Sequence, residues 1–482
     1  MKAQQFLFTL LTSFSLSVWA TVAVNAAESP VTITLDPQHP GAAIAPDFFG
    51  LSFEASLLLP DANGLHYFRP DNLPLINLFH TLGIKNLRIG GNTSDRDVRR
   101  LPGEADLDSL YLFARAAGVK VIYCLRLHNG DPQADAAMVK YIMSHYTAQM
   151  DCFSIGQEPS AYPKPYLYSD YRDDWKKFAD AIVAAVPDVK FCGPGVHNNA
   201  DWARRFIADF GHSHRVVLIT EHLYAGGAGG KVPAPEIGRD RMLSDEFTGK
   251  YQNLYDGFVP MAISNGLPYR LEEVNNYFNG GATNVSNTFA SALWGLDFMY
   301  WWAAHGAAGL NFHTGDRVAA GRTLQPSKYT AFFTTTNGYL VRPLGYGLKA
   351  FDLGGHGKFV PATISNPDNL NLSAYVVLGD DNDLYLTIIN KEHGAAAHDA
   401  RISIHQNSAG YQRSEVIFLS APQNDIAATV GETLGGAPIQ RDGSWDGTWT
   451  PLSPPMIHNL ADGVFLVRIP VASAAVVKLT RN

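Results

Sequence analysis

The sequence predicts an α/β fold: a (β/α)₈ barrel that carries an antiparallel β-sandwich. Short apolar strand patterns alternate with helix-period segments from about residue 48 to residue 313, which is typical of repeated βα units. Beyond about Gly347 the helical periodicity gives way to short alternating strands. A lone alternating strand, Val31–Leu35, precedes the barrel and needs partners elsewhere. The 482 residues, 46% of them hydrophobic, can bury both cores.

Eight stretches are predicted to form the barrel: Phe48–Phe53, Asn86–Gly90, Val119–Leu127, Cys152–Gly156, Val189–Gly193, Val216–Thr220, Tyr269–Glu273 and Gly309–His313. Between them we expect the helices Leu73–Leu82, Asp106–Ala117, Ala134–Met143, Tyr171–Val186, Asp201–Phe210, Phe258–Asn265 and Asn287–His305. An open doubly wound sheet is the alternative. No Gly-rich phosphate loop follows the first strand to favour it.

The C-terminal third is predicted to form the sandwich from strands Asn371–Leu378, Asp383–Asn390, Ala400–Ile404, Ser414–Leu419, Val464–Ile469 and Ala475–Leu479. Val31–Leu35 is best placed as its extra strand. We therefore expect residues 28–46 to join the sandwich, residues 47–346 to form the barrel and residues 347–482 to form the sandwich domain.

The N-terminus has the layout of a secretory signal peptide over residues 1–27, with Lys2, an apolar run from Phe6 to Val24 and the small residues Ala26 and Ala27. A membrane anchor is the alternative, but threonines and serines dilute the apolar run. We expect a secreted or periplasmic protein without a membrane span.

Composition argues against two classes of function. The net charge of −8 and the lack of a dense basic run disfavour nucleic-acid binding. Cys124, Cys152 and Cys192 fall in predicted apolar strands, with no Cys/His cluster at the spacing of a metal site. We expect free buried thiols, with a Cys152–Cys192 pair as the alternative, and neither a metal nor an organic cofactor.

Two predicted barrel strands end in carboxylates. Glu158 follows one and is succeeded by Pro159, while Glu272 and Glu273 end another. Active sites of such barrels lie at the C-terminal ends of the strands, and two facing carboxylates suit glycoside hydrolysis. Side chains alternate along a strand, so one of Glu272 and Glu273 should face the barrel axis. Periodicity alone does not choose between them.

The motifs around these glutamates carry a resemblance. Gly156-Gln157-Glu158-Pro159, followed by the run from Glu273 to Ala282, resembles the clan A retaining glycosidases, and within them glycoside hydrolase family 79, the β-glucuronidase and heparanase family. Leu87–Gly91, His222–Tyr224 and Asn287–Phe289 support the likeness, which covers nearly the whole mature chain.

The resemblance implies that Glu158 is the general acid/base and Glu273 the nucleophile, because Asn275 and Gly280-Gly281 fall where the family's asparagine and glycines follow its nucleophile. In a retaining enzyme the two carboxyl groups lie roughly 5–5.5 Å apart. We expect the charge of Glu273 to raise the pKa of Glu158, so that Glu158 starts protonated.

The chain departs from the family pattern at two positions. Gln157 stands where the family usually has an asparagine that binds the sugar 2-hydroxyl, and Phe278 stands where a tyrosine near the sugar carboxylate is expected. Tyr277 or Tyr329 is the candidate replacement for that tyrosine. The remaining predicted contacts are His222 and Tyr224, which would orient Glu273 and the substrate, Arg88, which would steady a carboxylate, and Asn92, His128 and Lys328, which would bind sugar or carboxylate groups.

The sequence thus predicts an exported retaining β-glycosidase, most of all an exo-acting β-glucuronidase with a carbohydrate substrate. The alternatives are heparanase-like endo cleavage, which the acidic balance of the chain disfavours for a sulfated polymer, and a β-glycosidase for neutral sugars. A non-catalytic carbohydrate-binding protein on a degenerate barrel is the alternative of another class. Keeping both glutamates argues against it.

Overall fold

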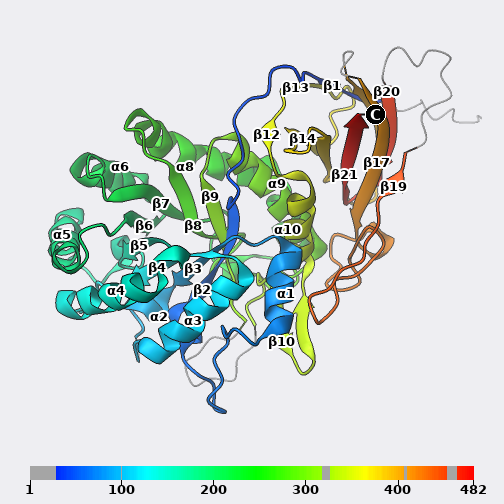
Figure 1. The fold of residues 1–482 in the computed structure, drawn as a ribbon. Helices are drawn as coiled ribbons and strands as arrows, with labels where there is room; N and C mark the ends of the chain where they lie inside the picture. Colours follow the sequence, from blue (N-terminus) through cyan, green and yellow to red (C-terminus); the bar gives the residue numbers. More distant parts are fainter. Residues whose placement is uncertain (1–28, 99, 317–325, 407–409, 453–463, 482) are drawn as a thin grey trace, which may run out of the picture.

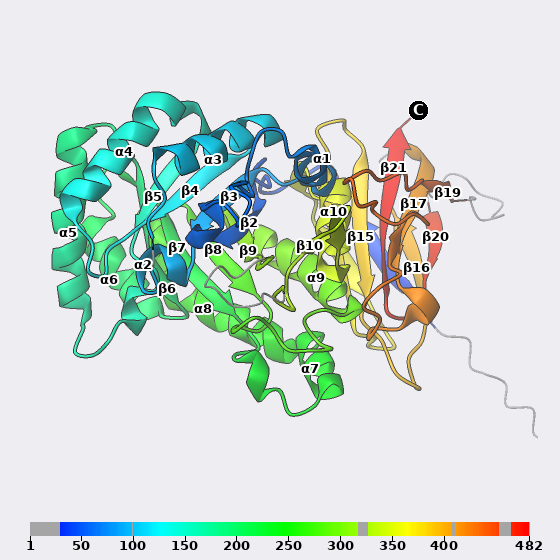
Figure 2. The ribbon, with the colours of Figure 1, turned by 90° about the horizontal axis from the view of Figure 1, so that it is seen from below.

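The structure is a computed structural model that describes residues 29–98, 100–316, 326–406, 410–452 and 464–481. A β/α barrel forms one half of the molecule, and a sandwich of two β-sheets forms the other half (Figures 1 and 2). The predicted signal peptide, residues 1–27, lies outside the described residues. Among those that are described, no helix combines the length and apolar character needed to cross a bilayer.

Eight parallel strands close into a barrel in chain order, which confirms the predicted fold class. They are β2 (Phe49–Glu54), β3 (Asn86–Gly90), β4 (Lys120–Leu125), β5 (Met150–Ile155), β6 (Phe191–His197), β7 (Val216–Tyr224), β8 (Tyr269–Asn275) and β9 (Gly309–His313). Side chains fill the barrel on the inside and helices cover it on the outside. This burial on both faces explains why the strands are apolar runs without alternation.

The helices around the barrel are α1 (Leu73–Leu82), α2 (Asn92–Asp95), α3 (Glu104–Ala117), α4 (Pro132–Tyr146), α5 (Tyr168–Ala185), α6 (Ala200–Phe210), α7 (Pro235–Met242), α8 (Asp245–Ser264) and α9 (Phe289–Ala304). Short 3-10 turns are η1 (Ala55–Leu58), η2 (Thr147–Gln149), η3 (Pro159–Ala161), η4 (Gly229–Lys231) and η5 (Pro422–Asn424). Local signals set the helix starts: the Asp131 carboxylate accepts a hydrogen bond from the Gln133 N–H at 3.0 Å and caps α4.

Helix α10 (Pro343–Gly354) was not expected from the sequence. The glycines in this segment weaken the helical pattern of the sequence. At least one of them is required by the close packing of α10 against α9. A Cβ on Gly347 would lie 2.5 Å from the Ala292 carbonyl oxygen of α9. The glycine therefore allows α9 and α10 to pack closely between the barrel and the sandwich, where Tyr300 also reaches Thr387 of the sandwich at 2.8 Å.

The sandwich consists of two sheets. One has the order β13 (Ala362–Ser365), β1 (Val31–Leu35), β16 (Ala400–His405), β20 (Val464–Ile469). The other has the order β12 (Lys358–Phe359), β14 (Leu372–Leu378), β15 (Leu384–Asn390), β21 (Ser473–Arg481), β17 (Tyr411–Ser420), β18 (Thr433–Leu434), with β19 (Thr450–Pro451) also paired to β17. Strand β1 joins the sandwich as predicted. Its pairing with β16 is parallel, whereas we expected antiparallel sheets.

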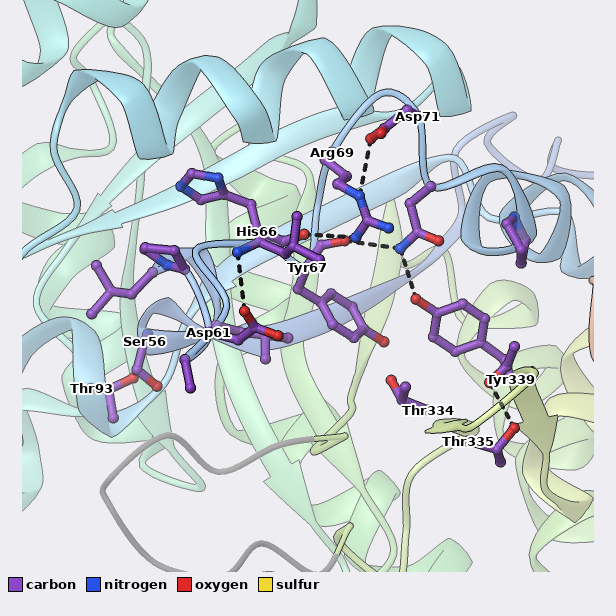
Figure 3. Close-up of a pocket in the computed structure, with 18 of the residues that line it drawn as sticks. Ser56, Asp61, His66, Tyr67, Arg69, Asp71, Thr93, Thr334, Thr335 and Tyr339 are labelled. Atoms are coloured by element: carbon purple, nitrogen blue, oxygen red, sulfur yellow. Dashed lines mark hydrogen bonds and ion pairs between the residues drawn. The ribbon is translucent and has the colours of Figure 1, made fainter.

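Two smaller features complete the described fold. A hairpin of β10 (Phe332–Thr335) and β11 (Gly338–Val341) follows the barrel and stands beside the β2–α1 segment (Figure 3). Cys124, Cys152 and Cys192 are buried in β4, β5 and β6 and are all free thiols, as expected.

Candidate active site

A cavity of about 630 Å³ opens at the C-terminal ends of the barrel strands. Its size is that of a small-molecule site. The walls combine carboxylates, aromatic rings and backbone from loops that follow most of the strands. Its main lining residues are Glu54, Asn92, Arg96, Gln157, Glu158, His197, Tyr224, Glu273, Phe278, Gly280, His313 and Tyr329.

Glu158 sits at a sharp turn immediately after β5. Its backbone is left-handed, with φ 48° and ψ 56°, and Pro159 after it begins the turn η3. Such a conformation is costly for a residue with a side chain and persists where the surroundings enforce it. Here the Glu158 N–H donates to the Gly195 carbonyl at 3.0 Å. The turn directs the carboxylate into the cavity, toward His222 and Arg96.

Glu272 and Glu273 both contact groups inside the barrel, so the alternation expected from strand geometry is broken. The pairing of β8 with β7 shifts by one residue at this point, and its pairing with β9 shifts between Leu271 and Val274. This bulge places two successive side chains on one side. Arg88 contacts both carboxylates, with Nη1 2.7 Å from Glu273 and Nε 3.9 Å from Glu272.

Arg88 and Gln157 hold one oxygen of Glu273. Arg88 is fully buried, and its Nη2 donates to the Gln157 Oε1 at 2.5 Å. That oxygen also accepts from the Gly91 N–H at 3.2 Å, which leaves the Gln157 amide nitrogen to donate to Glu273 Oε2 at 3.0 Å. Gln157, whose side chain is one methylene longer than that of the asparagine usual in the family, thus contacts the carboxylate of Glu273 directly.

The other oxygen of Glu273 accepts a hydrogen bond from the Tyr224 hydroxyl at 2.8 Å. Burial alone would raise the pKa of Glu273, but the positive charges of His313, His222 and Arg88 outweigh it and hold that pKa well below its ordinary value. Glu273 is therefore an ionised carboxylate at neutral pH. It is oriented by three donors and open to the cavity.

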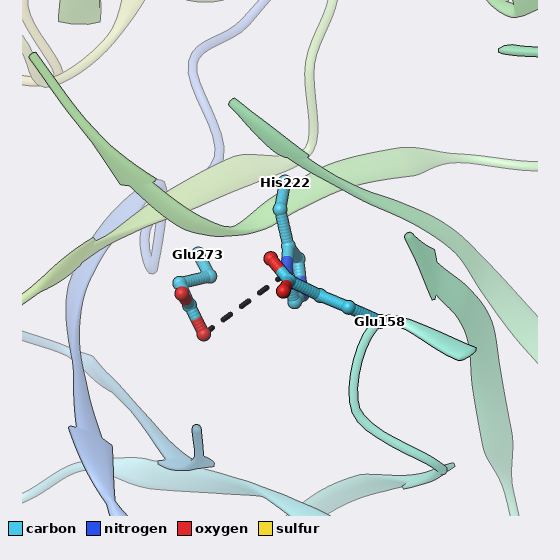
Figure 4. Close-up of side chains that lie close together, drawn as sticks. All are labelled: Glu158, His222 and Glu273. Carbon is cyan, nitrogen blue, oxygen red and sulfur yellow. Dashed lines mark hydrogen bonds and ion pairs between the residues drawn. The ribbon is translucent and has the colours of Figure 1, made fainter. Parts of the chain in front are cut away.

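His222 lies among the carboxylates of Glu158, Glu272 and Glu273, of which Figure 4 draws Glu158 and Glu273. Its Nδ1 is 3.1 Å from Glu158 Oε1, and its Nε2 is 3.6 Å from Glu272 Oε1. Burial disfavours the imidazolium, but the charge of Glu273 and the bonds to Glu158 and Glu272 raise the pKa of His222 to about 9. At neutral pH the ring holds a proton on each nitrogen.

The pKa of Glu158 is lower than its ordinary value, and the sequence-based expectation of a raised pKa was wrong. Burial and the charge of Glu273 do act to raise it, but the hydrogen bond and charge of His222 outweigh them. Arg96, 2.9 Å from Glu158, lies on the other side of the carboxylate. In the resting state the proton available for acid catalysis therefore resides on His222, which is one hydrogen bond away from Glu158.

Glu158, His222 and Glu273 form one compact group, with one oxygen or nitrogen of each within 4.8 Å of the others. Among the residues that the structure describes, no other group of side chains is close enough to hold a metal ion. The arrangement is suited to proton transfer next to an anionic nucleophile.

The structure brings most of the predicted site residues together. Gln157, Asn92, Tyr224, Phe278 and Tyr329 line the cavity beside the two glutamates, and Arg88 and His222 support them from inside the barrel.

Three predicted contacts do not line the cavity. The Tyr277 hydroxyl donates to the Gly238 carbonyl at 2.8 Å, away from the site, because Phe278 takes the inward position. His128 is turned against the Tyr162 ring, with centroids 4.9 Å apart. Lys328 contributes its backbone N–H, which donates to the Gly280 carbonyl at 2.6 Å.

Sequence reasoning missed several residues of the cavity as site residues, among them Arg96, His313 and His197. Arg96 pairs with Glu158, and His313 lies 3.9 Å from Glu273. His197 stacks edge-on against Phe278, with centroids 5.5 Å apart. His197 was missed because Pro194 made β6 look shorter than it is. For Arg96 and His313, their place just after or at the end of a barrel strand was the available signal.

Comparison with known proteins finds relatives among carbohydrate-active enzymes. No protein-family model matches the chain. A β-glucuronidase of Aspergillus niger is 27% identical over 187 residues, covering 34% of this chain and 34% of the relative. A β-glucuronidase of Neurospora crassa is 24% identical over 204 residues, covering 38% and 36%. The matched segments thus span about a third of the length of these relatives.

Solved structures extend the likeness to the whole fold. A 4-O-α-L-rhamnosyl-β-D-glucuronidase from Fusarium oxysporum superimposes with a TM-score of 0.71 at 16% identity, covering 93% of this chain and 100% of that chain. A family 51 arabinofuranosidase from Xanthomonas axonopodis reaches a TM-score of 0.66 at 14% identity, covering 94% and 100%. The β-glucuronidase relatives agree with the resemblance to glycoside hydrolase family 79 that the two glutamate motifs indicated, and the solved structures share the predicted fold.

Proposed function

We propose that this chain is an exported retaining β-glycosidase that hydrolyses terminal β-linked glucuronosyl groups by double displacement. The observation that carries the proposal is the pairing of Glu158 and Glu273 across the cavity, with carboxylate oxygens within 4.8 Å. Retaining glycosidases hold their carboxyl groups about 5–5.5 Å apart, and inverting enzymes about 6.5–9.5 Å. The spacing favours direct attack by Glu273 over activation of a water between the two groups.

In the first step, Glu273 attacks the anomeric carbon and forms an ester, while the bond to the leaving oxygen breaks. Glu158 gives its proton to that oxygen. In the second step, Glu158 takes a proton from water, the water oxygen attacks the anomeric carbon, and the ester bond to Glu273 breaks. The product keeps its anomeric configuration because the carbon is inverted twice.

His222 supplies the proton that Glu158 needs for the first step. The charge of Glu273 is the strongest influence that keeps His222 protonated. As Glu273 forms its ester, that charge disappears and the imidazolium loses its main support. The proton then moves through the 3.1 Å contact to Glu158 and on to the leaving oxygen. Nucleophilic attack and acid catalysis are thereby coupled.

The glucuronide specificity rests on the relatives, which are described as β-glucuronidases, and on the cavity wall. Arg96 gives that wall positive charge. Beside it, burial lowers the pKa of His313, but the charges of Glu273 and Glu54 outweigh burial and leave that pKa above its ordinary value. A carboxylate on the sugar suits such a wall better than a neutral group does.

The direct test is to follow p-nitrophenol release from matched β-glucuronide, β-glucoside and β-xyloside by the purified mature chain, with NMR observation of the first-formed anomer. We expect preferential cleavage of the glucuronide and formation of the β-anomer. Faster cleavage of a neutral glycoside would contradict the substrate, and formation of the α-anomer would contradict the mechanism.

Replacing Tyr224 with phenylalanine is expected to lower kcat/KM by about 10- to 100-fold, because a hydrogen bond to a charged group contributes about 1.5–3 kcal/mol. Tyr277→Phe is the matched control, since its hydroxyl bonds a backbone carbonyl outside the cavity. Steady-state kinetics on the aryl glucuronide would measure both. Equal losses in the two variants would show that the Tyr224 hydroxyl has no special role.

The pH dependence of kcat/KM should fall on the basic side as the His222–Glu158 pair loses its proton, near the His222 pKa of about 9. Glu272→Gln removes a negative charge beside His222, so the imidazolium becomes less stable and its pKa falls. The basic limb should move to lower pH by about one unit. Glu246→Gln, an exposed glutamate paired with Arg241, is the control and should leave the profile unchanged.

A further inference from the structure

A carboxylate that the mechanism does not use lies behind the candidate active site. Asp95, the last residue of the short helix α2, is fully buried and does not line the cavity. The next residue, Arg96, does line it and pairs with Glu158. Burying a carboxylate is costly unless its oxygens are hydrogen-bonded, so the partners of Asp95 indicate what the residue does.

Four donors converge on the Asp95 carboxylate. Its Oδ1 accepts from the backbone N–H groups of Leu127 and His128, which follow β4, at 2.9 and 2.6 Å. Its Oδ2 accepts from the backbone N–H of Gln157, which follows β5, at 2.8 Å, and from the Tyr162 hydroxyl. A carboxylate can accept at both oxygens, whereas an amide cannot. One side chain thereby ties the ends of β3, β4 and β5 together.

The two bonds to Oδ2 hold both sides of the turn that carries Glu158. Gln157 directly precedes Glu158, and Tyr162 directly follows η3. Within this turn the backbone is left-handed at Gly156, with φ 91°, and at Glu158, with φ 48°. A left-handed residue with a side chain persists only where its neighbours enforce that conformation. Asp95 enforces it from the side of the turn that faces away from the cavity.

The turn sets the position of Glu158 relative to its proton source. Glu158 Oε1 lies 3.1 Å from His222 Nδ1, and the proposed proton transfer uses this contact. The side-chain amide of Gln157 also reaches Glu273, at 3.0 Å, but Glu273 keeps other donors on both of its oxygens. A shift of the turn would therefore disturb Glu158 more than the nucleophile.

We propose that Asp95 is a positioning residue for acid/base catalysis, which holds Glu158 where it receives a proton from His222 and passes it to the leaving oxygen. The role rests on the proposed function and deepens it. Because Asp95 acts through the turn, its loss should slow the steps that use Glu158 and spare the others. Attack on an alkyl glycoside needs the proton, whereas attack on a nitrophenyl glycoside does not.

Asp95→Asn is the variant that tests this role. The amide oxygen should face the two N–H groups after β4, since that orientation loses one backbone hydrogen bond and the reverse orientation loses two. The amide nitrogen then meets the Gln157 N–H, so that two donors oppose each other, while the Tyr162 hydroxyl can rotate to accept. The change keeps the size of the side chain and removes the bond next to Glu158.

We expect kcat/KM for an alkyl β-glucuronide to fall by about 10- to 100-fold in Asp95→Asn, and that for the p-nitrophenyl β-glucuronide by about threefold or less. For the aryl substrate kcat and KM should fall together, because hydrolysis of the ester also uses Glu158. Azide should restore that kcat. Asp135→Asn is the matched control: Asp135 is a buried residue of α4 whose Oδ2 has no hydrogen-bond partner among the described residues. It should affect both leaving groups equally.

Tyr162→Phe is a second variant, which carries the test if Asp95→Asn does not fold. It removes one donor to Oδ2 and keeps the ring, so the loss on the alkyl glucuronide should exceed that on the aryl glucuronide by about threefold. Equal losses on the two substrates, without rescue by azide, would overturn the inference, because they would show a role in folding alone.

A failure of the proposed function would be distinct, since the wild-type protein would then hydrolyse no glucuronide. A crystal structure of the variant that folds still tests the placement of Glu158. Loss of the 3.1 Å contact between Glu158 and His222 would support the positioning role, and an unchanged contact would overturn it.

Discussion

Glu273→Gln is expected to lower kcat/KM for an aryl β-glucuronide by about 10⁴-fold or more, because no other group is placed to form the glycosyl ester. The amide keeps the size of the side chain and can still accept from Tyr224. The folded protein should survive the change, since Arg88 keeps the carboxylate of Glu272 at 3.9 Å and is not left as an unpaired buried charge. Kinetics and thermal unfolding measure the two effects separately.

Glu272→Gln is the matched control for this experiment, because it alters the adjacent, equally buried carboxylate in the same way. It should leave most of the activity at neutral pH and change mainly the pH profile. A severe loss in Glu272→Gln with activity retained in Glu273→Gln would show that the two roles are exchanged. The bulge in β8 makes this a real alternative, as both side chains face Arg88 and His222.

Glu158→Ala is expected to lower kcat/KM by about 10²–10⁴-fold for glucuronides with alkyl leaving groups, which need a proton, and far less for a nitrophenolate, which does not. Hydrolysis of the ester should then become slow, since no base activates water. Azide is a small nucleophile that needs no base, and it should accelerate turnover and form a β-glucuronosyl azide. Product analysis by NMR checks the configuration.

Arg96→Lys serves as the control, because it keeps a positive charge near Glu158 while disturbing its geometry. It should show no azide rescue. A Glu158→Ala enzyme that loses activity equally on good and poor leaving groups, and that azide does not restore, would rule out the acid/base role.

The fold was accessible from the sequence because each barrel strand is a local apolar run followed by its own helix. The proximity of Glu158 and Glu273 followed from the rule that strand ends meet at one face. Their catalytic roles stay predictions. Helix α10 was missed because its glycines are explained only by contact with α9, which no local pattern reveals.

The electrostatics of the site could not be predicted in the same way. The pKa of Glu158 depends on His222 from β7, whose own proton depends on Glu272 and Glu273 from β8. The inward turn of Glu272 depends on a shift of pairing with two neighbouring strands. These are properties of three-dimensional neighbours, and so is the outward position of Tyr277 next to the inward Phe278.

The insertion of β1 between β13 and β16 has a consequence for how the chain is assembled. The barrel can close as soon as residues 49–313 are available, whereas Val31–Leu35 waits for partners that are synthesised much later. Until these strands pair, each of them presents open hydrogen-bonding edges, which are sites for association with other chains. We therefore expect the sandwich to form after the barrel. A protein truncated after the barrel would keep strand β1 but lack β13 and β16, with which β1 pairs.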